Sequence, residues 1–191
     1  MARKAGKPFS TLKGSAREKA LEWGRETLQE IFDPDEFTEN LKEYAEWKHG
    51  LKAEKCYWAL GHCQGDGVAF YGTVDLSSLA EKHADLAAVL AAFSMACPNV
   101  SIWAKIQGEH RRYHGWSSMD ALVEVDCYDE ERDSADETLE WIQRWLNDTL
   151  KDISQDVERY GYAELDYRES DEEAIDFIEG NEYRFTQAGE C

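Results

Sequence analysis

Residues 134–160, SADETLEWIQRWLNDTLKDISQDVERY, are the segment that most constrains the fold. On a helical wheel at 100° per residue, most of its apolar side chains fall on one side. That side consists of Leu139, Ile142, Leu146, Leu150, Ile153, Val157 and Tyr160. We therefore expect one long helix whose apolar side faces the core of the protein and covers a sheet.

The candidate strands of that sheet are short and rich in aromatic and β-branched residues. In VAFYGTVDL, for example, Phe70 and Val74 alternate with Tyr71 and Thr73, which is the period of a half-buried strand. We predict strands near 55–61, 67–75, 99–107 and 120–128, and EYRFT near the carboxyl end as a final edge strand.

Helical spacing and capping signals predict the remaining elements. Ser15 with Glu18, Ser134 with Glu137, and Asp33 before Pro34 are typical of helix starts. The predicted helices begin near residue 15, at 34–49, at 79–96, at 134–160 and in SDEEAIDFIEG. The fold class is therefore α+β, an antiparallel sheet of about four strands flanked by helices, with 79–96 and 134–160 covering the sheet.

The chain shows no internal repeat and no linker, which favours a single domain over residues 1–191. Within it we expect a helical region at 1–50, the sheet with one helix at 51–128, and a strongly acidic helical region at 129–191.

The glycine-rich stretch LGHCQGDGVAFYG lies between the first two predicted strands. A phosphate-binding loop would lead into a helix and usually carries a lysine. Here a strand follows, and the only charge in the loop, Asp66, would repel phosphate. Gln64, Gly65, Asp66 and Gly67 therefore fit a hairpin connection better than a ligand loop.

Charge is distributed unevenly along the chain. The formal net charge is −19, of which residues 117–191 contribute −18 and residues 1–116 only −1. Residues 1–25 lean basic. Such an asymmetry bears on binding partners rather than on the fold, and it opposes direct binding to nucleic acid.

The polar side of the helix at 134–160 is the candidate binding surface. It brings Trp141 and Trp145 into one band with Asp148, Asp152 and Asp156, which succeed one another by one helical turn, about 6 Å. Acidic residues just before the segment and in its first turn extend this band. The candidate partner-binding residues are Asp133, Asp136, Glu137, Trp141, Trp145, Asp148, Asp152 and Asp156.

Two interpretations of this band stay open. The aspartates can simply keep a solvated surface soluble, with either tryptophan covered by other elements. Alternatively, the carboxylates steer a basic partner and the tryptophans anchor it. Acidic runs before and after the helix, CYDEERDSADE and ELDYRESDEEAIDFIEGNE, favour the second interpretation.

Three stretches resemble a family of uncharacterised proteins encoded by phages and other mobile elements. CQGDGVAF is similar to the SQGDGASF of that family, RRYHGWSSM to its central motif, and ESDEEAIDFIEGNEYRFTQAG to its NEYEFTEDG ending. Cys63 departs from the serine that the family favours, which makes a catalytic hydroxyl there unexpected. The resemblance implies an origin in a mobile element and no particular chemistry.

Catalytic and metal chemistry find little support in the residue pattern. The five cysteines form no CxxC pair, and His110 and His114 lie four residues apart in an expected turn rather than a helix. Cys63 and His62 are neighbours, which on a strand would point to opposite faces. We therefore expect no metal, no cofactor and no enzymatic activity.

These observations predict an inhibitor of a host defence complex, such as an anti-CRISPR or anti-restriction protein. Its acidic surface would mimic DNA in the basic groove of the complex, in the cytoplasm of a bacterial host. One alternative is a small-ligand protein or enzyme with its site at the QGDG hairpin. Another is an antitoxin-like regulator for which the basic residues 1–25 form a separate contact.

Overall fold

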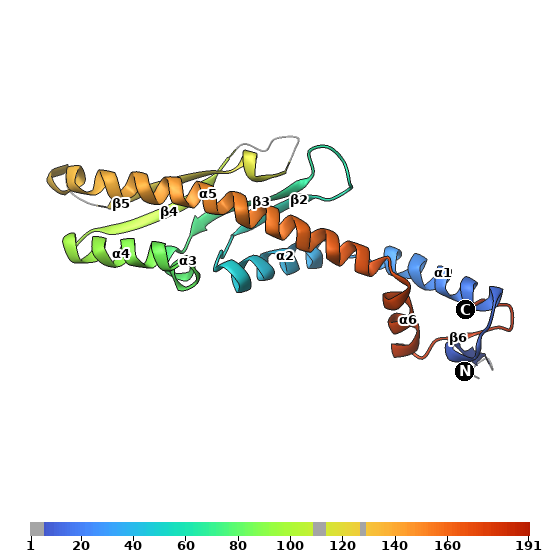
Figure 1. Cartoon of the computed structure of the whole chain (residues 1–191). Coiled ribbons are helices and arrows are strands. Elements are labelled where there is room, and N and C mark those ends of the chain that lie inside the picture. Colours follow the sequence, from blue (N-terminus) through green and yellow to red (C-terminus); the bar gives the residue numbers. More distant parts are fainter. Residues whose placement is uncertain (1–5, 109–113, 127–128) are drawn as a thin grey trace. The chain divides into compact units, whose positions relative to one another are not determined.

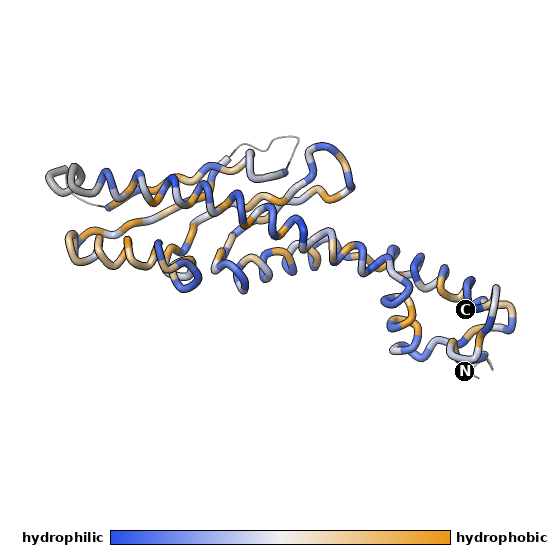
Figure 2. Tube along the Cα trace, in the orientation of Figure 1, coloured by the Kyte–Doolittle hydropathy of each residue, from blue (hydrophilic) through white to orange (hydrophobic). Residues whose placement is uncertain are grey.

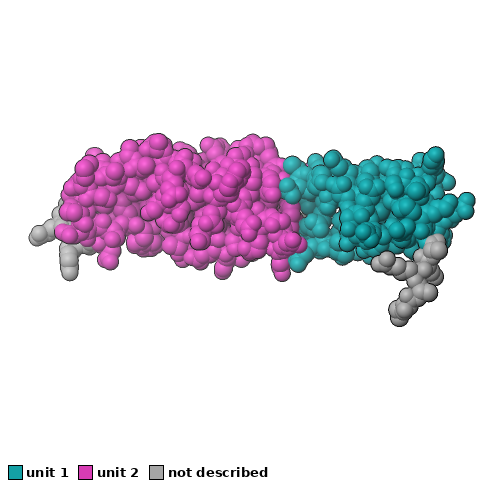
Figure 3. Space-filling view, turned by 90° about the horizontal axis from the view of Figure 1, so that it is seen from below, with its two compact units in different colours: residues 1–33, 162–191 teal, residues 34–161 magenta. Residues whose placement is uncertain are grey.

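The protein has an α+β fold in which helices flank a four-stranded antiparallel sheet (Figure 1). The structure is a computed structural model that describes residues 6–108, 114–126 and 129–191, with side chains from residue 136 onward in the last range. The predicted fold class is thus confirmed. Where a single domain was expected, contacts group the residues into two compact units, 1–33 with 162–191 and 34–161 (Figure 3).

The unit of residues 34–161 contains the sheet. Its strands are β2 (Lys55–Ala59), β3 (Gly67–Val74), β4 (Ser101–Gln107) and β5 (Asp120–Asp126), in the spatial order β2-β3-β4-β5. Each pair of neighbours is antiparallel. The four strands lie where the alternation of the sequence predicts them, each within two residues of the expected bounds.

Helices cover one face of this sheet. They are α2 (Pro34–His49), α3 (Leu76–Lys82), α4 (Ala84–Ala96) and the greater part of α5 (Asp129–Arg168). The covered face includes Phe70, Val74, Ala104 and Ile106, all buried. Side chains that point to the other face are largely exposed, among them Lys55, Thr73, Trp103, Lys105, Gln107 and Glu124.

Helix α5 buries the side that its periodicity predicts. Ile142, Leu146, Leu150, Ile153 and Val157 are buried, and α5 alternates between hydrophobic and hydrophilic colours along its length (Figure 2). On the same side, the Ser154 hydroxyl donates a 2.6 Å hydrogen bond to the carbonyl of Val68, and so ties α5 to β3. Leu139 and Tyr160, at the ends of the predicted stripe, are only partly buried.

Three predicted helix boundaries are wrong. Helix α5 begins at Asp129, before the Ser134–Glu137 pattern, because Glu, Arg and Ala favour helix there. It also runs past Gly161, where Leu60 packs so closely that a Cβ would meet its Cδ1 at 2.6 Å. The segment predicted as one helix at 79–96 is two, α3 and α4, because Asp75 caps a helix that starts at Leu76 and ends before His83.

The unit of residues 1–33 and 162–191 has its own small core. Helices α1 (Ser15–Glu30) and α6 (Asp171–Gly180) pack together, and β1 (Lys7–Pro8) pairs with β6 (Arg184–Phe185). The predicted strand EYRFT is thus present as β6, in this pair. Ser15 does not cap α1 with its side chain as predicted, because Gly14, with φ of 56°, takes the cap position.

Candidate binding surfaces

The predicted acidic band on α5 is only partly exposed. Asp136, Glu137, Asp148 and Asp152 are exposed. The side chain of Asp133 lies outside the described residues. Exposed cations lie on the same helix, Arg144 and Lys151, and the ammonium of Lys151 lies 4.8 Å from the ring centre of Trp116. Opposite charges therefore interrupt this band.

Trp141 and Trp145 pack against the protein itself. Both are partly buried, and their rings stack with centroids 6.3 Å apart. The indole N–H of Trp145 donates a 2.7 Å hydrogen bond to Asp85 at the start of α4, and its ring meets His83 edge to face. These contacts attach α5 to the α3–α4 junction, so part of each indole surface is used within the unit.

Asp156 forms a cluster with side chains of two helices, α2 and α5. Its Oδ2 lies 2.7 Å from Nζ of Lys48 and 2.9 Å from Nε2 of His49, and its Oδ1 accepts a 3.0 Å bond from Arg159. Burial alone would raise the pKa of the Asp156 carboxyl. The hydrogen bonds from these three groups outweigh burial and hold that pKa well below its usual range. Asp156 therefore stabilises the contact between α2 and α5.

The low pKa of Asp156 predicts a loss of stability in acid. Its pKa is lower in the folded chain than the value of about 3.9 expected in the unfolded chain. The stabilisation is therefore complete above that value and declines as the pH falls from about 4 toward the folded pKa. We expect Asp156→Asn to lower the free energy of unfolding by about 2 kcal/mol at pH 7 and by clearly less at pH 3.

Urea unfolding at both pH values measures this difference. Asp152→Asn, one helical turn away and exposed, is the matched control, and we expect it to change stability by less than about 0.5 kcal/mol. An equal loss for Asp156→Asn at pH 7 and pH 3 would contradict the assigned role of the carboxylate.

Among the side chains that the structure describes, the densest acidic surface lies in the other unit, at residues 164–182. This segment spans the end of α5 and all of α6 and contains one cation, Arg168, and nine acidic residues, of which all but Glu173 are exposed. The exposed ones are Glu164, Asp166, Glu169, Asp171, Glu172, Asp176, Glu179 and Glu182. At a rise of about 1.5 Å per residue, the segment carries roughly one carboxylate per 3 Å of helical path. That density is close to the one phosphate charge per ~3.4 Å of duplex axis that a single DNA strand presents.

The QGDG stretch forms a hairpin turn between β2 and β3. The Asp66 carboxylate accepts hydrogen bonds from the backbone N–H of Gly61 (2.7 Å) and of Cys63 (2.8 Å), and so closes the loop. Gly65 and Gly67 both have positive φ. A Cβ on Gly67 would lie 2.3 Å from the carbonyl oxygen of His114. Gln64 is exposed. Asp66 and the glycines thus serve the turn and the segment packed on it.

Among the described cysteines, Cys56 is buried in the core. Burial raises the pKa of the Cys56 thiol to about 12, which removes its nucleophilic form at neutral pH. Across the described residues, no group of three His, Cys, Asp or Glu side chains has an arrangement that could hold a metal ion. His110 and Cys127 lie outside the described residues.

None of the helices in the described part of the chain combines the length and apolar composition needed to cross a membrane.

No protein-family model, curated protein or solved structure matches the chain. Its surfaces must therefore be interpreted from their own chemistry. In the sequence, the surface at 164–182 is part of the acidic run that follows the helix at 134–160. The sequence shows its charge density but not its position in a separate unit. The core of that unit contains Trp23 and Phe185, which come from opposite ends of the chain.

Proposed function

We propose that this protein is an inhibitor that binds the basic nucleic-acid groove of a host defence complex, a CRISPR effector or a restriction enzyme. The observation that carries the proposal is the exposed acidic surface at residues 164–182, defined above. A surface of this kind attracts basic grooves over a distance of about 8–10 Å at ordinary salt, and it needs no catalytic group.

Two further observations support a DNA-mimic role. The density of carboxylates along this surface approximates that of the phosphates of one DNA strand along the duplex axis, whereas the carboxylates of the band on α5 are wider spaced. Each surface has one carboxylate paired with a cation of α1 or α2, Asp171 with Arg25 and Asp156 with Lys48. The resemblance to proteins of phages and mobile elements suits an inhibitor of host defence that acts in the bacterial cytoplasm. The proposed partner is a basic protein complex rather than nucleic acid, and no cofactor is involved.

Phage plating tests the proposal. Hosts that carry single, defined CRISPR or restriction systems are compared with and without expression of the protein. We expect plating to recover against at least one system. If plating recovers against none across a broad panel, the inhibitor function is wrong.

A further inference from the structure

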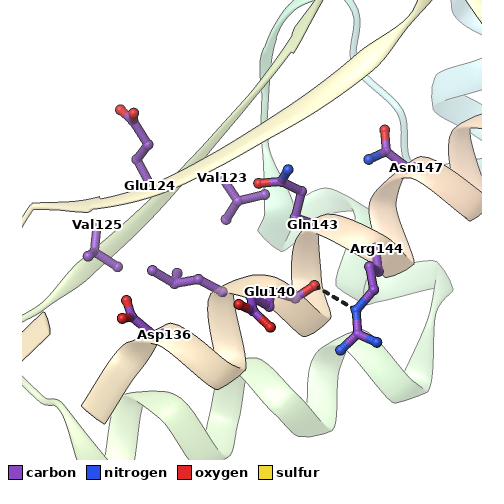
Figure 4. A pocket seen from close by; sticks show the side chains of 9 residues that line it. Val123, Glu124, Val125, Asp136, Glu140, Gln143, Arg144 and Asn147 are labelled. Atoms are coloured by element: carbon purple, nitrogen blue, oxygen red, sulfur yellow. Dashed lines mark hydrogen bonds between the residues drawn. The ribbon is translucent and has the colours of Figure 1, made fainter. Parts of the chain in front are cut away.

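A large groove lies between β5 and α5. It has a volume of about 680 Å³ and is lined by residues of β5 and of the first described turns of α5 (Figure 4). That volume lies within the range of roughly 300–1,000 Å³ that is typical of ligand sites. Val123 and Val125 of β5 and Leu139 of α5 supply its apolar lining, and Gln143 and Asn147 its amide groups.

The wall of the groove on the β5 side is an open sheet edge. Strand β5 is the last in the order β2-β3-β4-β5. The backbone N–H of Ala121 points away from β4 and donates a 2.8 Å bond to the side-chain oxygen of Asn147. In an antiparallel strand the N–H groups of Val123 and Val125 point to the same edge. Within the described part of the chain, the structure shows no acceptor for either of them.

Such an edge accepts an added strand. A peptide in extended conformation can pair its backbone with that of an edge strand, and side-chain contacts then select its sequence. The side-chain oxygen of Asn147 accepts the N–H of Ala121. A peptide carbonyl would accept the N–H of Val123 or Val125 in the same way. We propose that the groove binds an extended peptide segment of a partner protein, added to β5 as a fifth strand of the sheet.

The two faces of β5 specify the chemistry of that peptide. Val123 and Val125 point toward α5, whereas Glu124 points to the opposite side (Figure 4). Asp120 and Asp126 share the face of Glu124, and all three are exposed. Their direct neighbours on β4 are Gln107, Trp103 and Ser101, and β4 has one cation on this face, Lys105, opposite Leu122. Three carboxylates thus face one lysine. A bound peptide therefore alternates apolar residues, which face the groove, with Lys or Arg, which face the three carboxylates.

The same charges disfavour a second copy of this chain as the occupant. Pairing of two β5 edges would bring Asp120, Glu124 and Asp126 of one molecule beside those of the other, and like charges on adjacent strands repel. The peptide site does not rest on the proposed function, since it involves residues of a different unit from the acidic surface at 164–182.

Fluorescence anisotropy with a synthetic peptide, Gly-Lys-Val-Arg-Val-Lys-Val-Gly, tests the inference on the full chain. Two N-methylated forms, methylated at the valines or at the basic residues, remove one set of backbone donors each without any change to the protein. Only the set that faces β5 contributes to the ladder, so we expect one form to bind at least about tenfold more weakly and the other to bind almost normally. A peptide with Glu in place of Lys and Arg should not bind.

Protein variants locate the site. Glu124→Lys should weaken binding, whereas Glu43→Lys, on the exposed side of α2, should leave it unchanged. Absence of peptide binding, equal binding of the two methylated forms, or dimers of the chain that Glu124→Lys alters would each overturn the inference. Plating against defence systems is scored separately, so a failure here is distinct from a failure of the proposed inhibitor.

Discussion

Replacing three exposed carboxylates of α6 is expected to slow association with the inhibited complex by about tenfold or more. The changes are Glu172→Gln, Asp176→Asn and Glu179→Gln, all within the acidic surface at 164–182. Electrostatic steering raises association rates by factors of about 10–10³, and that gain falls as the charge falls. Dissociation should change less, because the three side chains are exposed and not part of the core.

The matched control removes the same charge from elsewhere. Glu43→Gln, Glu46→Gln and Glu81→Gln are also exposed, on α2 and α3 of the other unit. Surface plasmon resonance against the complex identified by plating gives both rate constants, and circular dichroism checks that α6 stays helical. If both triple variants slow association equally, net charge is responsible and the surface at 164–182 is not a defined binding site.

Gly67→Ala is expected to lower the free energy of unfolding by about 2–4 kcal/mol. Gly67 has φ of 155°, and a Cβ there would meet two backbone atoms, the oxygen of His114 at 2.3 Å and the Cα of Gly115 at 2.9 Å. A strained backbone angle and an overpacked contact each cost about 1–3 kcal/mol. Backbone cannot move aside as a flexible side chain would, so β3 or the segment at 114–115 must shift.

Gln64→Ala in the same loop is the control for Gly67→Ala. Gln64 is exposed, and we expect its removal to change stability by less than about 0.5 kcal/mol. Thermal unfolding of the two variants shows whether the hairpin has a structural role that depends on Gly67. A Gly67→Ala variant as stable as the parent chain would contradict the structural role of the turn and would renew interest in a ligand at this loop.

The strands of the larger unit and the buried side of α5 were predictable because each depends on a local pattern. Alternation of Phe70 and Val74 with Tyr71 and Thr73 identified β3, and the apolar stripe from Ile142 to Val157 identified the buried side of α5. Positive φ at Gly65 and Gly67 likewise agrees with the hairpin that the glycines predict. Local spacing is sufficient for such elements, since neighbours in sequence determine which face is apolar.

Whether a predicted binding residue is exposed or paired depends on its contacts with residues that are distant in sequence. Asp156 looks like one member of an exposed row until α2 brings Lys48 and His49 to it, and Trp145 looks like an anchor until Asp85 accepts its N–H bond. A helical wheel shows which residues share a side but not what packs against that side. The division into two units was equally out of reach, because it depends on contacts between the two ends of the chain.

Competition with DNA tests the proposed mimicry most directly. The purified complex that plating identifies is loaded with fluorescent target DNA, and the protein is added at 50 mM and at 300 mM salt. We predict that the protein displaces the DNA, and that displacement weakens steeply at the higher salt, as screening of its carboxylates requires. Inhibition that leaves the DNA bound, or displacement that salt does not alter, would contradict a charged decoy at the nucleic-acid groove.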